Sequence, residues 1–400
     1  MRPGERNDPT RPGDGERDDP ARPGRGERDD PALRGDPAGA PEQASVSAIV
    51  VSYGDPSLAR GAIESLLAQT HPPIEVLAVD NTPPASASAA AAGLLPPIPR
   101  SERVRLIRPG ANIGYTRAVN LAARSAAGEW LLLLNPDAIA ERPCVRELLA
   151  AVDGEDVAVV GAQVLLPDGR VNAGENPVNI AGLSWSGGYG SRREHGLARD
   201  VAAVSGAALL VRRSAFERVG GLSPHFFMYV DDTDLCWRMR LSGGRVRFAP
   251  SAVVVHDYEF VKGPHKWFYL ERNRYAALLT NLNLRTLVML APLLAATELA
   301  TISHAIANGW LRQKLRAWRA LAASLPELRA WRSHVQSSRT VSDYRVMSGF
   351  VGAVESDLLD RAVPALGNRA LELYRMLLLA ALRRCEGAGS VESETSSPAP

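Results

Sequence analysis

Cysteine is scarce in this chain of 400 residues. Its three cysteines, Cys144, Cys236 and Cys385, stand far apart and form neither a CxxC pair nor a Cys/His metal pattern. Disulfide frameworks and zinc sites show characteristic close or repeated cysteine spacings. We therefore expect reduced cysteines with structural roles, and a cytoplasmic protein.

An excess of one charge and long apolar runs are also missing. The net charge of +2 is small, and no basic stripe interleaved with aromatic residues occurs in the first 270 residues, so we do not expect nucleic acid as a partner. The first residues lack the apolar core of a signal peptide, and we expect no export. Two uncharged runs, 286–297 and 299–311, fall short of the roughly 18–20 residues that span a bilayer, so no spanning helix is expected.

Residues 1–44 repeat with a period of eleven, beginning with GERNDPTRPGD. These units hold few apolar side chains and many prolines, glycines and balanced charges, so burial cannot offset the entropy of ordering them. We expect a disordered tail here, and a second one over the polar residues 387–400. The remaining chain should fold, because 46% hydrophobic and 22% charged residues are typical of a globular protein.

Apolar β-branched runs alternate with amphipathic helical stretches from residue 45 onward: SAIVVSYG, IEVLAVDN, VRLIRP and EWLLLLNPDA. Such runs predict a parallel sheet with helices on both faces, which binds ligands beyond the carboxyl ends of its strands. Ser52 and Tyr53, Asp80 and Asn81, and Asn135 with Asp137 each follow one of these runs. We expect these side chains to converge on one crevice.

The stretch FFMYVDDTDLCWRMR, residues 226–240, places three carboxylates where a helix begins. A helix cap or a first-turn charge accounts for one or two of them. Two adjacent acids in a partly enclosed site repel, which raises the pKa of one and makes it a usable proton acceptor. The residues alone leave both interpretations open.

The clusters VSYG, VDN, GANIGYTRAVN, LNPDA and VDDTDLCWR, in this order, resemble the inverting family 2 glycosyltransferases of the GT-A fold, especially their rhamnosyltransferase-like branch. The resemblance covers about residues 47–281. It implies an α/β, Rossmann-like GT-A domain over 45–281, followed by a helical extension over 282–386. It also implies transfer of a sugar from a nucleoside diphosphate to an acceptor hydroxyl.

The resemblance further implies which residues hold the donor. The residues at the first two strand ends would bind the nucleobase and ribose, and the N-x-G loop comes next in the chain. Arg117, near a helix N-terminus, would neutralise the diphosphate; the alternative is that Arg117 is only a solvated charge. The donor-binding residues would be Ser52, Tyr53, Asp80, Asn112, Gly114, Arg117 and Asn135.

The family's metal-binding D-x-D motif is present here as Asn135-Pro136-Asp137. The resemblance implies that Asp137 binds Mg²⁺ or Mn²⁺, with His256 at the end of a later strand as a further ligand. Loss of the first acid should weaken metal binding unless substrate phosphates complete the shell. A plain turn at Asp137 and a structural His256 remain the alternatives.

In the family the acidic pair before the D-L-C-W-R helix supplies the catalytic base. The matching residue here is Asp232, with Asp231 beside it raising its pKa and Asp234 in the first helical turn. The nearby aromatic residues Phe226, Phe227, Tyr229 and Trp237 could belong to the core or form a stacking platform for the acceptor. Related enzymes use the segment that matches 265–274 as a flap over donor and acceptor.

The helical stretch 311–325 carries leucines and Trp318 on one face and Arg312, Arg316 and Arg319 on another. This pattern fits an in-plane membrane contact, or a helix packed on the catalytic domain with a solvated basic face. The first interpretation places the protein at the inner face of the cell membrane.

The expected acceptor is a glycan or polyprenyl-linked hydroxyl in cell-envelope or surface polysaccharide assembly. The resemblance to the rhamnosyltransferase-like branch alone makes dTDP-rhamnose the first expected donor. The alternatives are a galactofuranosyl- or hexosyltransferase, or a catalytically idle scaffold that binds sugar nucleotides, which the missing first acid of D-x-D motivates.

Overall fold

The computed structural model describes residues 44–54, 57–83, 99, 101–256, 265–355 and 364–395, without the side chains of 57 and 387–395. The predicted tail over 1–44 lies outside these residues except for Ala44, which is buried in the core, so the tail was predicted one residue too long. The described residues all belong to one compact unit that spans 39–400.

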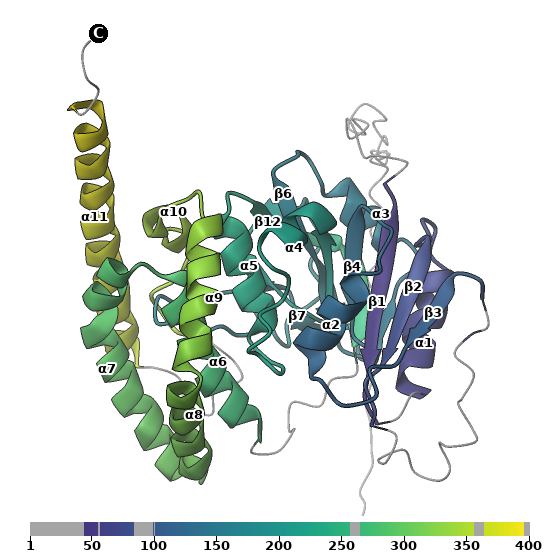
Figure 1. Ribbon diagram of the computed structural model, residues 1–400, viewed down its shortest axis with the longest axis horizontal. Coiled ribbons are helices and arrows are strands. Elements are labelled where there is room, and N and C mark those ends of the chain that lie inside the picture. The colour runs from purple at the N-terminus through teal and green to yellow at the C-terminus, as the bar shows by residue number, and fades with distance from the viewer. Residues whose placement is uncertain are drawn as a thin grey trace, which may run out of the picture. The chain divides into compact units, whose positions relative to one another are not determined.

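One half of the central sheet is parallel, in the order β3-β2-β1-β4 (Figure 1). Its strands are β1 (Val46–Ser52), β2 (Glu75–Asp80), β3 (Val104–Ile107) and β4 (Trp130–Leu134). Alternate residues of β1 enter two cores: Ile49 faces α2 (Tyr115–Ala123), and Val50 faces α1 (Ser57–Leu67). Both faces of the sheet are therefore covered by helices, as the apolar runs predicted.

The other half of the sheet is mixed, and the expectation of a parallel sheet is wrong here. The order continues β4-β11-β6-β12-β5, and β11 runs antiparallel to both of its neighbours. These strands are β11 (Ala208–Arg212), β6 (Val157–Leu165), β12 (Arg245–His256) and β5 (Ala138–Ala140). Burial on both faces produces the same continuous apolar run in either direction, so the pattern predicts burial without direction.

RVRFAP and AVVVHD form one strand, β12, where the sequence suggested two. Its register against β6 shifts between Ala249 and Val253, around Pro250, which has no N–H for the ladder. Beyond the shift, β12 pairs with β5 so that His256 lies opposite Ala138.

Shorter elements complete the sheet-containing part. They are α3 (Cys144–Ala150), β7 (Val171–Ala173), β8 (Glu175–Asn176), β9 (Arg199–Asp200), β10 (Ala203–Val204), α4 (Arg213–Arg218) and α5 (Asp231–Leu241). The helix α5, which begins with the acid pair, packs on β10 and β12.

Helices make up the C-terminal part of the described chain. They are α6 (His265–Asn281), α7 (Leu284–Ala307), α8 (Leu311–Ala323), α9 (Leu325–Ser338), α10 (Asp343–Met347) and α11 (Ala365–Thr395). Leu290 of α7, Val335 of α9 and Leu378 of α11 join the same core as the α2 face of the sheet. The backbone of α11 continues past residue 387, where we expected order to end.

The first uncharged run and most of the second, as far as Ala307, lie in one continuous helix, α7, so the expectation that no segment is long enough to span a membrane is wrong. Within the described ranges, α7 is the helix that is long and apolar enough to do so. Its most apolar 18-residue stretch has a mean hydropathy of 1.6, and 17% of that stretch is buried. Length and composition alone support this, and they are weak evidence. Glu298 had divided the two runs in the sequence.

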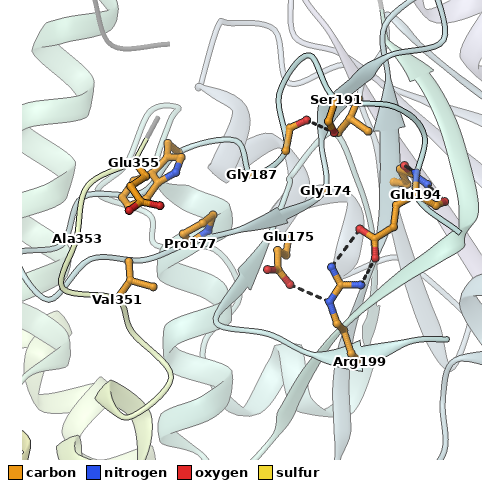
Figure 2. A pocket seen from close by; sticks show the side chains of 14 residues that line it. Gly174, Glu175, Pro177, Gly187, Ser191, Glu194, Arg199, Val351, Ala353 and Glu355 are labelled. Atoms are coloured by element: carbon orange, nitrogen blue, oxygen red, sulfur yellow. Dashed lines mark hydrogen bonds and ion pairs between the residues drawn. The ribbon is translucent and has the colours of Figure 1, made fainter. Parts of the chain in front are cut away.

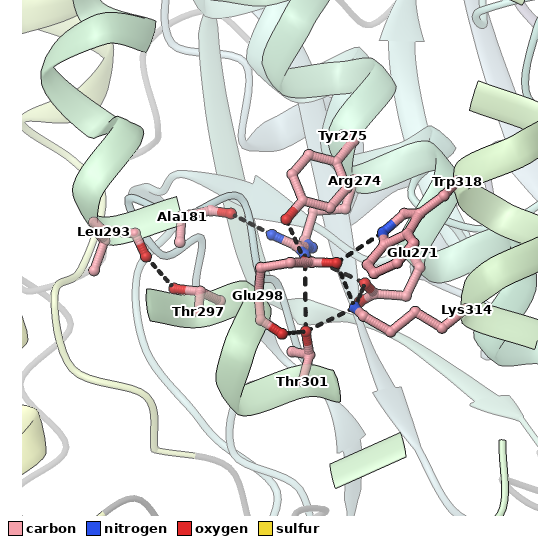
Figure 3. A network of polar contacts seen from close by, with 10 residues as sticks. All are labelled: Ala181, Glu271, Arg274, Tyr275, Leu293, Thr297, Glu298, Thr301, Lys314 and Trp318. Carbon is pink, nitrogen blue, oxygen red and sulfur yellow. Dashed lines mark hydrogen bonds and ion pairs between the residues drawn. The ribbon is translucent and has the colours of Figure 1, made fainter. Parts of the chain in front are cut away.

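Glu298 lies inside α7 because its charge is paired (Figure 3). Its carboxylate accepts from Trp318 Nε1 at 2.7 Å and lies 3.0 Å from Lys314 Nζ. Lys314 is fully buried and also donates to Glu271 at 2.5 Å. Buried charges persist when each has such a partner. This network joins α6, α7 and α8, so α8 packs on the protein while Arg312, Arg316 and Arg319 remain exposed.

Asp234 has a structural role within α5. Its carboxylate accepts from Arg238 Nε at 2.9 Å and from Asn281 Nδ2 at 3.0 Å, and both Asp234 and Arg238 are almost completely buried. The pair joins α5 to the end of α6. Asp234 lies in the first turn as expected, and it is held apart from the two acids that precede it.

Candidate functional site

The ends of β1, β2 and β4 meet at one edge of the sheet. Ser52 lies opposite Asp80, and Val50 lies opposite Leu134, which directly precedes Asn135. Ser52 is buried and its hydroxyl lies 3.4 Å from Val79 O, so it faces the sheet backbone. Tyr53 is 57% exposed at this edge. The strand ends converge as the sequence predicted.

Asp80 is half-buried, and both its oxygens have partners. Oδ1 accepts from the N–H of Thr82 at 3.2 Å, and Oδ2 lies 3.4 Å from Arg108 Nε. The first contact is that of an ordinary turn residue. The second brings a cation to the place where the resemblance puts a nucleoside.

The side chain of Asn112 holds its own loop. Its Oδ1 accepts from Asn81 Nδ2 at 3.0 Å and from Gly114 N at 3.1 Å, while Asn81 Oδ1 accepts from Ile113 N at 3.0 Å. Gly114 has φ 82°, and a Cβ there would meet the ring of Phe227 at 2.6 Å. The N-x-G loop is thus fixed to the end of β2 by Asn81, which the sequence placed at this crevice without indicating its bonds to the loop.

The first turn of α2 is joined to the loop before α5. Tyr115 N donates to Phe227 O at 2.8 Å, the hydroxyl of Thr116 donates to Phe226 O, and Arg117 Nε donates to Pro224 O at 3.0 Å. Arg117 is exposed. One of its N–H groups is therefore occupied by the fold, and the rest of its guanidinium lies at the surface near the helix N-terminus.

Asp137 and His256 come together from separate strands. His256 Nε2 lies 2.9 Å from Asp137 Oδ1, and His256 is buried. Two ligands on adjacent corners of an octahedral shell with bonds of about 2.1 Å would lie roughly 3 Å apart, so the pair fits one divalent cation. Among the described residues no group of three or more His, Cys, Asp or Glu could hold a metal ion. Phosphate and water oxygens would therefore have to fill the remaining positions.

The acid pair follows a strained turn. Tyr229 has φ 68° and Val230 has φ 64°, which is uncommon for residues other than glycine and especially so for a β-branched one. Asn273 of α6, which is 0% exposed, donates to the carbonyls of Met228 and Tyr229 at 2.8 Å each. The turn that aims the acids is thus supported from α6.

Two backbone N–H groups donate to Asp232 and favour its ionised form. Its Oδ2 accepts from Gly206 N at 2.8 Å and its Oδ1 from Thr233 N at 2.7 Å. A Cβ on Gly206 would lie 3.1 Å from the Cβ of Asp232. The neighbouring Ala207 accepts at its carbonyl from Asn135 N at 2.9 Å, so residues 206 and 207 connect the acid pair to the NPD segment. In the sequence, Gly206 is only a glycine that precedes an apolar run.

The two acids lie in different environments. Burial, together with the negative charge of Asp232, raises the pKa of Asp231 to about 8. Burial also raises the pKa of Asp232, while the N–H groups of Gly206 and Thr233 oppose that rise. Burial and both carboxylates raise the pKa of Tyr115, which places its phenol beside the pair. The N–H donors favour the charged form of Asp232, so we expect a proton held by the pair to reside on Asp231.

The chain matches the family model described as "Glycosyl transferase family 2" over residues 47–220. It is 32% identical over 234 residues to the N-acetylglucosaminyl-diphospho-decaprenol L-rhamnosyltransferase of Mycobacterium tuberculosis, with 52% of this chain and 74% of that protein covered. The chain belongs to glycosyl transferase family 2. The predicted family, its GT-A fold and the enzyme class, a glycosyltransferase, are confirmed.

Other family 2 relatives match shorter stretches. The Rhamnosyltransferase WbbL of Escherichia coli K12 is 35% identical over 78 residues, which is 18% of this chain and 30% of that protein, and it supports the rhamnosyltransferase-like branch. Among solved structures, the mannosyltransferase PcManGT from Pyrobaculum calidifontis, in complex with GDP-Man and Mn²⁺, is 19% identical with a TM-score of 0.43. That match covers 76% of this chain and 87% of that one.

A cavity of about 330 Å³ lies apart from these residues (Figure 2). Arg199 forms ion pairs there with Glu194 and, at 3.1 Å, with Glu175. Neither Asp137 nor Asp232 lines this cavity. Since two carboxylates neutralise its arginine, the cavity is poorly suited to a diphosphate, and we do not assign the donor to it.

Asp231→Asn should change how stability depends on pH. The folded pKa of Asp231, about 8, lies above the value of 3.8 for an unperturbed aspartate, so the folded protein holds an extra proton between these values and loses stability as pH rises. Asparagine removes that loss. Relative to wild type, the variant should gain roughly 2–5 kcal/mol in unfolding free energy between pH 5 and pH 9.

Urea unfolding at the two pH values measures this difference, with Asp168→Asn at an exposed position as the control. Parallel pH profiles for Asp231→Asn and wild type would show that the proton does not reside on Asp231.

Proposed function

We propose that this family 2 glycosyltransferase moves a sugar, with inversion, from a nucleoside diphosphate to a hydroxyl of a glycan or polyprenyl-linked acceptor, with Asp232 as the base. The observation that carries the proposal is the ionised Asp232, which Gly206 holds and which residue 207 connects to the NPD segment. A fixed anion beside the end of the sheet is what deprotonation of an incoming hydroxyl needs.

In the proposed reaction the acceptor oxygen attacks the anomeric carbon as its proton passes to Asp232. The new C–O bond forms while the bond from that carbon to the diphosphate oxygen breaks, and the diphosphate leaves with the electron pair. Asp231 keeps its proton and limits the pair to one negative charge. Tyr53, Asp80 and the surface guanidinium of Arg117 would contact the donor.

Asp137 and His256 would hold Mg²⁺ or Mn²⁺ when the donor binds. The ion would neutralise charge on the leaving diphosphate. With a single carboxylate in the pair, metal binding should depend on the nucleotide, which completes the shell with phosphate oxygens. Asn135 would be a polar contact rather than a ligand.

Rhamnose from dTDP-rhamnose is the proposed transfer, in cell-envelope or surface polysaccharide assembly. Two relatives are named rhamnosyltransferases, and the name of one also includes a decaprenol-linked sugar, which supports this transfer. A galactofuranosyl or other hexosyl donor is the second candidate. Family membership makes the chain a glycosyltransferase, so we do not retain the idle scaffold.

We place the enzyme at the inner face of the cell membrane. Leu284, Val288, Leu299 and Ile306 of α7 are each more than 60% exposed, and the basic face of α8 is exposed beside them. Exposed apolar and cationic side chains on neighbouring helices suit an anionic lipid surface, where a polyprenyl-linked acceptor would be met.

Donor binding should depend on a divalent metal through Asp137. Calorimetric titration with a panel of nucleoside diphosphate sugars should find one donor whose affinity Mn²⁺ raises about tenfold or more, because the ion that Asp137 and His256 would hold would neutralise phosphate charge. In Asp137→Ala that increase should vanish, and in Asp168→Ala it should remain. Metal dependence that survives in Asp137→Ala would show that Asp137 is not a metal ligand. The absence of any bound donor would refute the proposed function.

Asp232→Asn should reduce transfer by about 10²- to 10⁴-fold, since an amide cannot accept the hydroxyl proton. The donor Kd should stay within a few-fold, because asparagine keeps an oxygen for the N–H of Gly206. Initial rates and calorimetry on the same preparation give both quantities. Substantial remaining turnover would mean that another group is the base.

Replacing Arg312, Arg316 and Arg319 with Glu should weaken binding to anionic vesicles by about tenfold or more, because each cation near such a surface contributes about 1 kcal/mol. Vesicle sedimentation measures the effect. The matched control replaces Arg60, Arg124 and Arg146, three exposed arginines of the sheet-containing part, with Glu. Equal binding by both triple variants would favour α8 as a packed helix with a merely solvated face.

A further inference from the structure

Four half-buried aromatic rings lie between the acid pair and α8. Tyr269 of α6 stacks on Phe227 with ring centroids 5.6 Å apart and an interplanar angle of 16°. It also lies 6.4 Å from the ring of Tyr229 and meets Phe268 edge-on at 5.0 Å. We call these four residues the aromatic shelf. Two of them, Phe227 and Tyr229, come from the turn that leads directly into Asp231.

The shelf differs from the core aromatics beside it. Phe226 and Trp237 are 2% exposed and pack among apolar side chains, whereas every member of the shelf keeps part of its ring accessible. Aromatic rings with one accessible face next to a catalytic group are typical of ligand sites, where they contribute large contact area at low entropic cost. The apolar faces of a sugar ring fit such a surface. Of the four aromatic residues, Phe226 and Trp237 therefore belong to the core, whereas Phe227 and Tyr229 are partly exposed.

Cations line the far side of the shelf. The guanidinium of Arg272 lies 5.4 Å from the rings of both Phe268 and Tyr269, and that of Arg316 on α8 lies 5.6 Å from Phe268. Arg272 is engaged by the fold, since it donates to Asn273 and to His225 O at 3.0 Å each. Arg316 is exposed and donates to Gln313 at 3.3 Å, which leaves further N–H groups to bind an anion.

We propose that the aromatic shelf and Arg316 form the acceptor subsite, and that the acceptor is a sugar carrying a diphosphate at its anomeric carbon. The sugar ring would lie on Tyr269 with a hydroxyl directed to Asp232, and its diphosphate would pair with Arg316. The order from Asp232 through Tyr269 and Phe268 to Arg316 runs toward α8, so a lipid attached to the diphosphate would leave along α7 and α8. The inference rests on the proposed function and deepens it.

Kinetics with two soluble acceptors test the subsite in the full-length enzyme, with dTDP-rhamnose as donor and without lipid. One is N-acetylglucosaminyl diphosphate with a short farnesyl chain, and the other is the phenyl glycoside of the same sugar, which lacks the diphosphate. Without vesicles, an effect of Arg316 cannot come from a lipid headgroup.

Arg316→Gln should raise the KM of the diphosphate acceptor about 5- to 20-fold and that of the phenyl glycoside less than about twofold, because a charge-assisted pair is lost only with the first. Arg329→Gln on α9, also exposed, is the matched control and should change neither KM. Equal effects on both acceptors, or none, would overturn the assignment of Arg316.

Tyr269→Leu keeps apolar bulk and removes the flat ring, so the KM of both acceptors should rise about 5- to 10-fold, whereas Tyr269→Phe should stay within about twofold. A fall in kcat with unchanged acceptor KM would show that the ring only supports the turn at Tyr229, and it would overturn the shelf as a subsite.

Calorimetric binding of the diphosphate acceptor separates the two proposals. Acceptor binding that Arg316→Gln weakens, in an enzyme that turns over no donor, would support the subsite and refute the proposed function. If the enzyme transfers sugar and neither Arg316→Gln nor Tyr269→Leu changes its affinity for the acceptor, the subsite alone would be overturned.

Discussion

Two neighbouring carboxylates at the buried start of α5 impose the constraint on which the surrounding structure depends. Their repulsion is relieved in two ways, because Asp231 keeps a proton and Asp232 receives two N–H donors. The start of α5 adds the favourable end of the helix dipole. One donor is the backbone of Gly206, so β11 must begin within hydrogen-bonding distance of the acid pair. The antiparallel entry of β11 beside β4 satisfies that condition and brings Asn135 to the same place.

The same constraint explains why the C-terminal helices belong to the site. A turn with two non-glycine residues at positive φ persists only where other groups hold it, and here Asn273 binds two of its carbonyls. The helix α6 is itself fixed, at one end by Asp234 through Asn281 and at its middle by the buried network of Glu271 and Lys314. The C-terminal helices, which the sequence predicted as an extension of the catalytic domain, therefore support the geometry of the acid pair.

What could be predicted from the sequence was local. The acids at strand ends, the polar start of α5 and the apolar strands follow from patterns within about fifteen residues, and they converge in the structure as expected. The contributions of Gly206 and Asn273, and the bond from Asn81 to Asn112, could not be predicted, because each joins residues 26 to 45 positions apart. Nor does a sequence show whether a polar atom is already occupied by the fold, as the hydroxyl of Ser52 and the amide of Asn112 are. Glu298 illustrates the converse, since its partners on α6 and α8 permit a charge inside α7.

On the proposed function, the proton of Asp231 and the amide of Asn135 act in the same direction. The donor brings a diphosphate into a crevice that already needs an ionised base and a metal ligand. A fully ionised acid pair together with two acids in the NPD segment would place four negative charges there. The protonated Asp231 and the amide of Asn135 leave two, one on Asp232 and one on Asp137. At the short distances and low dielectric of a closed site, each removed charge weakens the repulsion of the donor by an appreciable amount. The consequence is weaker metal binding in the absence of donor, so donor and metal should enter the crevice together.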